Sequence, residues 1–266
     1  MNEAAFFDLD KTIIAKSAVL AFGKPFYREG LLSRRTIVRG MYSQVVFMLV
    51  GADETRMERL RESMLSLVKG WDHAQVASIV RETLDEIVTP IIFQEALDLF
   101  DEHRAAGRRI VIVSSSPEEV VGPLTGYLGA DDFIATRSEL DADGCYTGEL
   151  EFYAYGPYKA DAMRTYASRH DIDLGASYGY SDSITDVPML EVVGHAVTVN
   201  ADRDLARYAK EHGWESLSFT RPVRLRDRVP VPSGQSAVAV GAVAAAGAGA
   251  AAIWWWLRRR DAALSR

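Results

Sequence analysis

Short apolar runs of strand length recur along this chain, and segments with helical periodicity fill most of the space between them. The runs are rich in β-branched or aromatic residues and cover residues 4–9, 110–114, 133–136, 177–180 and 196–199. Strands that alternate with helices favour a parallel sheet, because parallel neighbours need a crossover connection and that connection is usually a helix. We therefore expect an α/β fold, a Rossmann-like parallel sheet with helices on both faces.

A long helical segment separates the first strand from the second. Its length, about a hundred residues, is far more than one crossover requires. Apolar residues recur at three- and four-residue spacing over residues 31–50, 53–68 and 72–88, with glycines as breaks between them. This pattern predicts an inserted α-helical cap domain at 15–91 and a catalytic core made of 1–14 and 92–220.

One further segment departs from the strand–helix alternation. Asp143 and Gly144 stand between two short alternating stretches within residues 139–152. The pair Asp-Gly is a strong signal for a tight turn between antiparallel strands, so we expect a small β-hairpin there.

Charge and cysteine content limit the compartment and the partners. The chain has 266 residues and one cysteine, Cys145, so no internal disulfide can form. An apolar strand follows the first four residues directly, so we expect no signal peptide and a catalytic body in the reducing cytoplasm. Up to residue 220 there are 22 basic and 35 acidic residues. This acidic body argues against nucleic acid as a partner, since duplex binding needs a positive face.

Two carboxylates one residue apart, Asp8 and Asp10, follow the first strand in the stretch Asp-Leu-Asp-Lys-Thr. Ligands of open α/β sheets bind beyond the carboxyl ends of the strands, which is where this pair is expected. The alternative interpretation is a solvated pair that caps the next helix.

Polar groups also follow two later elements. Ser114 ends the second strand, and a helix is expected soon after it, so a hydroxyl and helix N-terminal amides could meet an anion there. A plain N-cap is the alternative. Lys159 opens a helix, where a cation opposes the helix dipole. A nearby phosphate would account for that position, although an exposed lysine is the simpler alternative.

A final pair of carboxylates, Asp182 and Asp186, lies where another strand gives way to a helix. Helix capping is again the alternative. Carboxylates, a hydroxyl and a lysine thus recur where successive elements meet. If they converge on one rim, they would bind a hard cation and a phosphate, because Mg²⁺ prefers carboxylate oxygens, water and phosphate.

These motifs together resemble those of the haloacid dehalogenase superfamily, in order and in spacing. The matching residues are Asp8, Asp10, Thr12, Ser114, Lys159, Asp182 and Asp186. The resemblance covers roughly residues 4–215, and the helical insertion after the first motif is similar to the cap of the phosphoserine phosphatase branch.

The resemblance implies a Mg²⁺-dependent phosphomonoester hydrolase. Asp8 would be the nucleophile that forms an aspartyl-phosphate, and Asp10 the general acid and then base. Mg²⁺ would be held by Asp8, the Asp10 carbonyl and Asp182. Ser114 and Lys159 would bind the phosphate oxygens, with Asp186 in a supporting role.

Some positions depart from the family pattern. Phosphoserine phosphatases have a Glu nine residues after the nucleophile to bind the substrate ammonium, whereas this chain has Ser17. We therefore expect a small phosphorylated substrate other than phosphoserine, with room for an apolar part in the apolar cap. Thr185 stands where relatives often have Asn. Arginines of the cap, Arg56, Arg59 and Arg61, resemble a substrate-facing basic stretch, although solvent exposure is the simpler interpretation.

The C-terminal region differs in amino-acid composition from the rest of the chain. A basic, Pro-rich linker is expected at 221–236, followed by an uncharged stretch at 237–257. A helix of 21 residues roughly matches the ~30 Å hydrocarbon core. Three tryptophans near its end, followed by three arginines, look like an interfacial anchor. We expect a transmembrane helix that attaches a cytoplasmic catalytic domain to the cell membrane. A flexible or surface-packed Ala-rich tail is the alternative.

Two other functions remain open from the sequence. A phosphotransferase or mutase would pass the phosphoryl group from Asp8 to an alcohol instead of water. A catalytically inactive, membrane-anchored binding protein has no need of the complete set of motifs.

Overall fold

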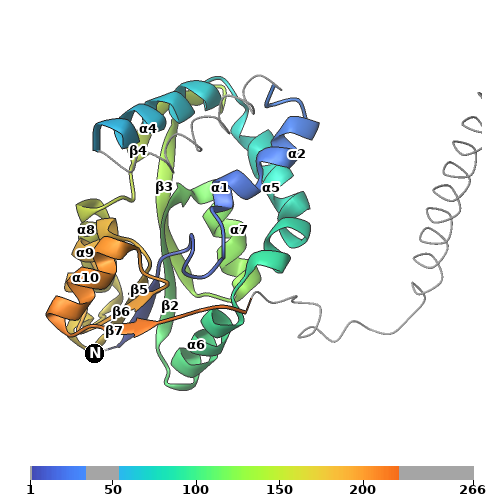
Figure 1. Ribbon diagram of the computed structural model, residues 1–266. Helices are drawn as coiled ribbons and strands as arrows, with labels where there is room; N and C mark the ends of the chain where they lie inside the picture. The colour runs from blue at the N-terminus through green and yellow to red at the C-terminus, as the bar shows by residue number, and fades with distance from the viewer. Residues whose placement is uncertain (1, 34–53, 222–266) are drawn as a thin grey trace, which may run out of the picture. The chain divides into compact units, whose positions relative to one another are not determined.

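The computed structural model describes residues 2–33 and 54–221, and these form an α/β fold, as predicted. In the described residues, a seven-stranded sheet has the order β4-β3-β2-β1-β5-β6-β7 (Figure 1). All neighbouring strands are parallel except β3 and β4. The strands are β1 (Ala4–Phe7), β2 (Arg109–Pro117), β3 (Asp132–Leu140), β4 (Tyr146–Phe152), β5 (Tyr178–Ser181), β6 (His195–Val199) and β7 (Glu215–Leu217).

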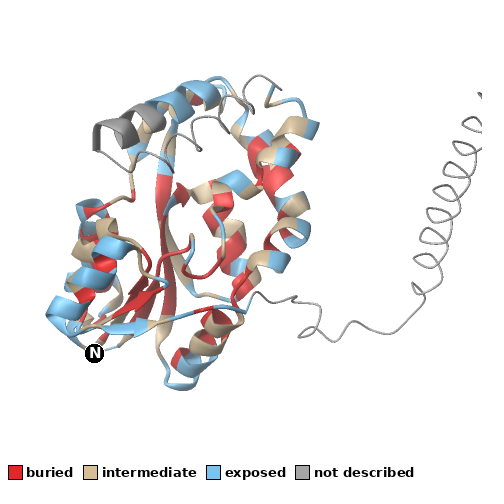
Figure 2. Ribbon diagram, in the orientation of Figure 1, coloured by how far each residue is buried: buried red, intermediate tan, exposed pale blue. Residues whose placement is uncertain are grey.

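Helices cover both faces of the sheet, and alternate residues of each strand serve the two faces. Phe7 and Ile112 belong to one apolar cluster, whereas Phe6 and Val111 belong to the other. The first cluster includes residues of α5 (His73–Val88), α6 (Gln94–Ala105) and α7 (Glu118–Leu128). The second includes residues of α8 (Pro157–His170), α9 (Val187–Glu191) and α10 (Arg203–His212). Figure 2 shows the buried residues gathered on the strands and on the helix faces that meet them.

The insertion after β1 is helical where the structure describes it. It contains α1 (Ala18–Ala21), α2 (Gly23–Arg28), α4 (Glu54–Val68) and α5, and a 3₁₀ turn at Thr89–Ile91 leads back towards α6. Two more 3₁₀ turns, at Leu174–Ala176 and Ile184–Asp186, flank β5. The predicted helix at 31–50 falls almost wholly outside the described residues, and 31–33 are not helical.

The predicted hairpin is present. β3 and β4 pair antiparallel, and the Asp141 amide donates to the Cys145 carbonyl at 2.9 Å. Gly144 has φ +78°, a conformation that glycine adopts without strain. The hairpin also bonds to the insertion, because the Gly70 amide donates to the Tyr146 carbonyl at 2.8 Å.

Two strand predictions were incomplete. β2 continues past Ser114 to Pro117, with a register shift against β3, so the helix begins only at Glu118. The three-residue strand β7 was missed because Glu215 and Ser216 are exposed and give no apolar run. Short edge strands of this kind pair through their backbone, which a side-chain pattern does not reveal.

The C-terminal predictions lie outside the described residues. These are the linker at 221–236, apart from Arg221, and the transmembrane helix at 237–257. Among the residues that the structure does describe, no helix has the length and apolar character needed to cross a membrane.

Candidate active site

The candidate site lies where the strand order reverses. β1 pairs with β2 on one side and with β5 on the other, so chain connections leave it in both directions. Ligands of open α/β sheets bind at such a switch point, beyond the carboxyl ends of the strands. Asp8 follows β1 there, and its amide donates to the Tyr180 carbonyl of β5 at 2.9 Å. The Asp8 side chain is therefore fixed at this edge by the sheet itself.

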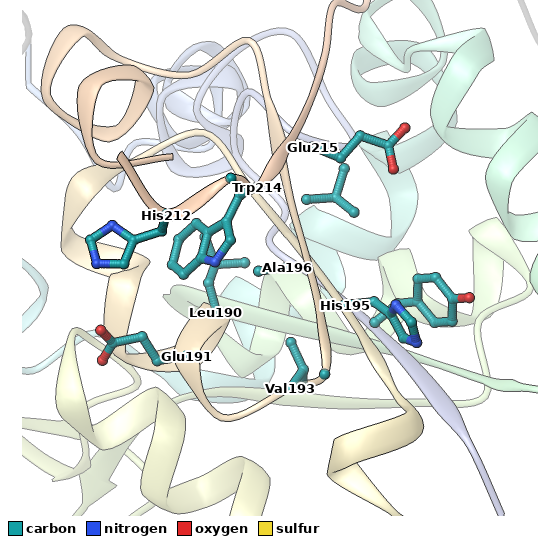
Figure 3. A pocket seen from close by; sticks show the side chains of 12 residues that line it. Leu190, Glu191, Val193, His195, Ala196, His212, Trp214 and Glu215 are labelled. Atoms are coloured by element: carbon teal, nitrogen blue, oxygen red, sulfur yellow. The ribbon is translucent and has the colours of Figure 1, made fainter. Parts of the chain in front are cut away.

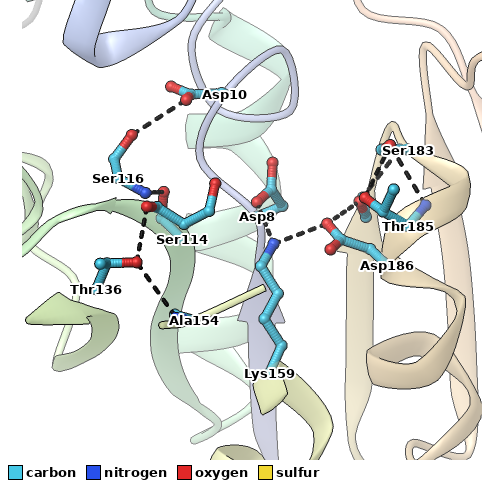
Figure 4. A network of polar contacts seen from close by, with 12 residues as sticks. Asp8, Asp10, Ser114, Ser116, Thr136, Ala154, Lys159, Ser183, Thr185 and Asp186 are labelled. Atoms are coloured by element: carbon cyan, nitrogen blue, oxygen red, sulfur yellow. Dashed lines mark hydrogen bonds and ion pairs between the residues drawn. The ribbon is translucent and has the colours of Figure 1, made fainter. Parts of the chain in front are cut away.

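A buried lysine joins two of the predicted site residues. Lys159 Nζ, from the first turn of α8, lies 2.7 Å from Asp8 Oδ1 and 2.8 Å from Asp186 Oδ2 (Figure 4). All three residues are buried. Burial lowers the pKa of Lys159, but the two carboxylates and their hydrogen bonds outweigh it, so the pKa is raised and the ammonium stays charged.

Asp186 has a further donor that the sequence did not reveal. The hydroxyl of Ser181, the last residue of β5, donates to Asp186 Oδ2 at 2.7 Å and is fully buried. One carboxylate oxygen thus accepts from both a serine and Lys159. A serine at a strand end carries no distinctive pattern, so only the fold could identify this role.

Asp10 is held from two directions. Its Oδ1 accepts from the Ala18 amide at 2.7 Å, and its Oδ2 accepts from the Ser116 hydroxyl at 3.1 Å (Figure 4). Ala18 begins the insertion's first helix, whereas Ser116 belongs to β2. Burial raises the pKa of Asp10, and these two hydrogen bonds act against the rise. No sequence pattern singled out Ser116, so its contact with Asp10 was missed.

Ser114 is buried at the end of the regular pairing between β2 and β3. Its Oγ accepts from the Ser116 amide at 3.1 Å, a bond that leaves the hydroxyl proton available for another acceptor. The next residue is also fixed, because the buried Thr136 hydroxyl donates to the Ser115 carbonyl at 2.8 Å. The bulged end of β2 is thus a rigid support for the Ser114 hydroxyl.

Negative charge exceeds positive charge at this edge. Among the described residues, this edge carries four carboxylates and two lysines: Asp8, Asp10, Asp182, Asp186, Lys11 and Lys159. Burial raises the pKa of Asp8 well above its usual value, Lys159 opposes that rise, and the other carboxylates add to it. Burial likewise raises the pKa of Asp182 to about 6. With all six groups ionised, the surplus is two negative charges, which one divalent cation would neutralise.

The predicted magnesium ligands fit this chemistry. Within residues 2–33 and 54–221, no group of three or more His, Cys, Asp or Glu side chains is arranged to hold a metal ion. The predicted set has only two side-chain carboxylates, Asp8 and Asp182, and its third ligand is the backbone carbonyl of Asp10. It is therefore compatible with the absence of a cluster of three ligating side chains in the described residues. Mg²⁺ sites of this sparse kind take their remaining ligands from water and phosphate.

Other predicted residues lie apart from these contacts. The Thr185 hydroxyl lies 3.1 Å from the Ser183 hydroxyl, and the Ser183 side chain caps the turn at Ile184–Asp186. Arg61 of α4 lies over the ring of Tyr153, 5.3 Å from its centroid. Ser17 is partly exposed and directly precedes Ala18, which contacts Asp10.

A separate cavity of about 590 Å³ opens at the opposite edge of the sheet (Figure 3). Its lining includes Tyr178, His195 and Glu215, the first residues of β5, β6 and β7. The predicted site residues instead follow the carboxyl ends of β1 and β5. The cavity therefore contains none of them.

The fold and this edge define an α/β enzyme with a cluster of buried carboxylates at the switch point. The family model described as haloacid dehalogenase-like hydrolase matches residues 5–191. The chain belongs to this family, as its motifs predicted.

Similar proteins agree with this assignment. The chain is 54% identical over 250 residues to a probable phosphatase of Mycobacterium tuberculosis, covering 90% of this chain and 87% of that protein. It is 33% identical over 244 residues to a phosphoserine phosphatase of the same species, covering 91% and 78%. A crystal structure of a protein of unknown function from Bordetella pertussis has a TM-score of 0.71 at 26% identity, covering 82% and 98%. The predictions of an enzyme and of the phosphoserine-phosphatase-like branch are thus confirmed.

We predict that Lys159→Met destabilises the protein by about 3 kcal/mol or more, because it leaves two buried carboxylates without their shared cation. Urea unfolding at neutral pH measures this loss. A second change, Asp186→Asn, should restore part of it by removing one of the stranded charges. Lys24→Met, at an exposed lysine, is the matched control and should have little effect. Equal stability of Lys159→Met and wild type would contradict the prediction.

Proposed function

We propose that the chain is a Mg²⁺-dependent phosphomonoester hydrolase that works through an aspartyl-phosphate on Asp8. The observation that carries the proposal is the Asp8 carboxylate itself, buried at the switch point and held by Lys159 at 2.7 Å. A fixed carboxylate beside a permanent cation can approach an anionic phosphate with less repulsion. The family and the names of its relatives support this reaction class.

The proposed reaction has two steps. In the first, an Asp8 oxygen attacks phosphorus, the bond to the ester oxygen breaks, and Asp10 gives that oxygen its proton. In the second, water attacks the phosphorus of the aspartyl-phosphate, Asp10 takes the water's proton, and inorganic phosphate leaves. The pKa of Asp10 is raised by burial, which suits a carboxyl that must hold and then release a proton.

Ser114 and Lys159 would bind the non-bridging phosphate oxygens, the first through its free hydroxyl proton and the second through its ammonium. Asp186 and Ser181 keep Lys159 in place. Asp8, the Asp10 carbonyl and Asp182 would hold Mg²⁺, which when bound neutralises phosphate charge. Lys159 approaches the nucleophile Asp8 from the first turn of α8.

The first test compares two variants on an activated aryl phosphate with Mg²⁺. Asp8→Asn should lower turnover by about a thousandfold or more, because an amide is a poor nucleophile. Asp10→Asn should still release about one equivalent of the phenol, which needs no proton to leave, and then stall as the aspartyl-phosphate. Mass spectrometry of the peptide that contains Asp8 would detect the trapped phosphoryl group.

Two outcomes would contradict this mechanism. Turnover by Asp8→Asn close to the wild-type rate would exclude a covalent role for Asp8. Wild-type rates in Asp10→Asn on an unactivated alkyl phosphate would exclude the acid–base role of Asp10. Circular dichroism and urea unfolding of both variants serve as the control for folding.

The substrate is a small phosphomonoester, and we propose that phosphoserine is not the preferred one. Ala18 contacts Asp10, so position 17 lies one residue from the site, and Ser17 offers no charge to a substrate ammonium. A related protein named phosphoserine phosphatase is only 33% identical. The apolar character of the predicted cap leaves room for an apolar part of the substrate.

The second test measures kcat/KM for phosphoserine against a panel of phosphomonoesters, including lipid phosphates in detergent. We expect at least one other substrate to exceed phosphoserine. Ser17→Glu should raise kcat/KM for phosphoserine by about tenfold, the effect of one charge-assisted hydrogen bond, whereas Ser17→Gln should not. A clear preference of the wild type for phosphoserine would refute the proposal.

We further propose that residues 15–91 act as a cap over a core of residues 1–14 and 92–220. The chain segments at both boundaries lie side by side, since Ile14 and Ile92 form a β-bridge and the Phe93 amide donates to the Ile13 carbonyl at 2.9 Å. Two adjacent chain crossings of this kind are a suitable place for a hinge. The contact of Asp10 with Ala18 would then tie the acid–base group to the first residues of the cap.

Attachment to the membrane through residues 237–257, with the enzyme on the cytoplasmic side, is proposed from the sequence pattern. Truncation after Arg228 should leave activity intact, because the proposed site residues all lie between Asp8 and Asp186. The described body also ends in contacts of its own, with the Gln94 amide donating to the Arg221 carbonyl at 2.9 Å. The full chain should sediment with membranes through high-salt and carbonate washes, whereas the truncated chain should not. Full-length protein in the soluble fraction would overturn the attachment.

A phosphotransferase of the same mechanism would pass the phosphoryl group to an alcohol acceptor. Product analysis in the presence of acceptor alcohols separates this alternative, because transfer yields a phosphorylated acceptor, whereas hydrolysis releases inorganic phosphate together with the substrate's own alcohol. This chain pairs the proposed nucleophile with a buried lysine. A protein that only binds its ligand has no need of that pair, so this alternative is disfavoured.

A further inference from the structure

Lys11, between the proposed acid–base residue and Thr12, has an unusual backbone conformation. Its φ is +63°, and its amide donates to the Ile14 carbonyl at 2.6 Å within the tight loop that follows Asp10. Among the described residues, the other non-glycine residues with positive φ are Asp171 and Asn200, types that tolerate this region well. A lysine here is strained where glycine would not be, and strain of this kind is a reason to look for a function of the side chain.

The side chain of Lys11 reaches a proposed metal ligand. Its Nζ lies 3.7 Å from Asp182 Oδ2, and the lysine side chain is 70% exposed whereas that of Asp182 is 9% exposed. The ammonium thus approaches a buried carboxylate from the solvent side. Lys159, by contrast, is buried and bonded to two carboxylates at less than 3 Å. One cation is therefore fixed in the site, and the other can leave it at little cost.

We propose that Lys11 is a displaceable counter-cation for Asp182, which a divalent metal ion must move aside in order to bind. This inference rests on the proposed function, because it takes Asp182 as a magnesium ligand. An ammonium and a metal ion that share one carboxylate repel each other, so the lysine weakens metal binding. Because the lysine is exposed, the weakening is modest, about two- to fivefold in Kd. Lys11 thereby raises, by the same factor, the Mg²⁺ concentration at which the site fills.

Isothermal titration of the full-length, metal-free protein with MgCl₂ alone tests this proposal at constant ionic strength, since salt screens exposed charges. Lys11→Met removes the charge and keeps a long, unbranched side chain, so Mg²⁺ should bind about two- to fivefold more tightly. Lys11→Arg keeps the charge and should bind like the wild type. Lys24→Met makes the same change in net charge at another exposed lysine and should also bind like the wild type.

Lys11→Gly separates the backbone from the charge. It should tighten Mg²⁺ binding as Lys11→Met does, and it alone should also raise the melting temperature of the metal-free protein, because glycine relieves the left-handed strain. A higher melting temperature without tighter binding would indicate that the charge has no effect on the metal.

The outcomes distinguish this proposal from the proposed function. Unchanged or weaker Mg²⁺ binding in Lys11→Met, together with loss of binding in Asp182→Asn, would overturn the role of Lys11 alone. Absence of Mg²⁺ binding in the wild type would overturn both the ligand assignment and the counter-cation. Tighter binding in Lys24→Met as well would reduce the effect to net charge and would likewise overturn the proposal.

Discussion

The candidate site depends on one buried ammonium group. Lys159 lies within hydrogen-bond distance of Asp8 and of Asp186, and all three are nearly inaccessible to solvent. Isolated charges are costly to bury, and two like charges are costlier still, so these carboxylates can share one edge only because the lysine lies between them. Burial raises the pKa of Asp8, and the attraction of Lys159 opposes that rise without cancelling it. Ser181 adds to this pairing through its hydrogen bond to Asp186, whereas Asp10 is held separately by Ala18 and Ser116.

The sheet explains why these groups meet at all. Asp8 and Lys159 are far apart in the chain, yet β1 lies between β2 and β5, and α8 packs on one face of the sheet with Lys159 in its first turn. Parallel strands direct their carboxyl ends to one edge, so residues that follow successive strands are brought together without specific long-range signals. The alternation of Phe6 and Phe7 between two apolar clusters fixes the strand against both helix layers. The apolar core thus sets the position of the polar site, although the site residues are not part of that core.

This division explains what could be predicted from the sequence. Strand and helix periodicity reports burial, so the fold class, the hairpin and the motif residues at strand ends were accessible. The serines that orient the carboxylates were not. Ser116 and Ser181 act through single hydrogen bonds to Asp10 and Asp186. Such a bond forms only when the fold places a hydroxyl from another strand or loop beside the carboxylate, and no local pattern of residues predicts that placement.

The two lysines of the site illustrate how burial sets the role of a charge. A buried ammonium with two short bonds cannot leave without exposing two buried carboxylates to each other, so Lys159 has a structural role in the site. An exposed ammonium at 3.7 Å from one carboxylate is hydrated before and after it moves, so Lys11 can exchange with another cation. When Lys11 moves into solvent, the four ionised carboxylates and Lys159 leave a surplus of three negative charges at this edge. A divalent ion would offset most of that surplus and leave the proposed nucleophile ionised, whereas protons on the carboxylates would block it.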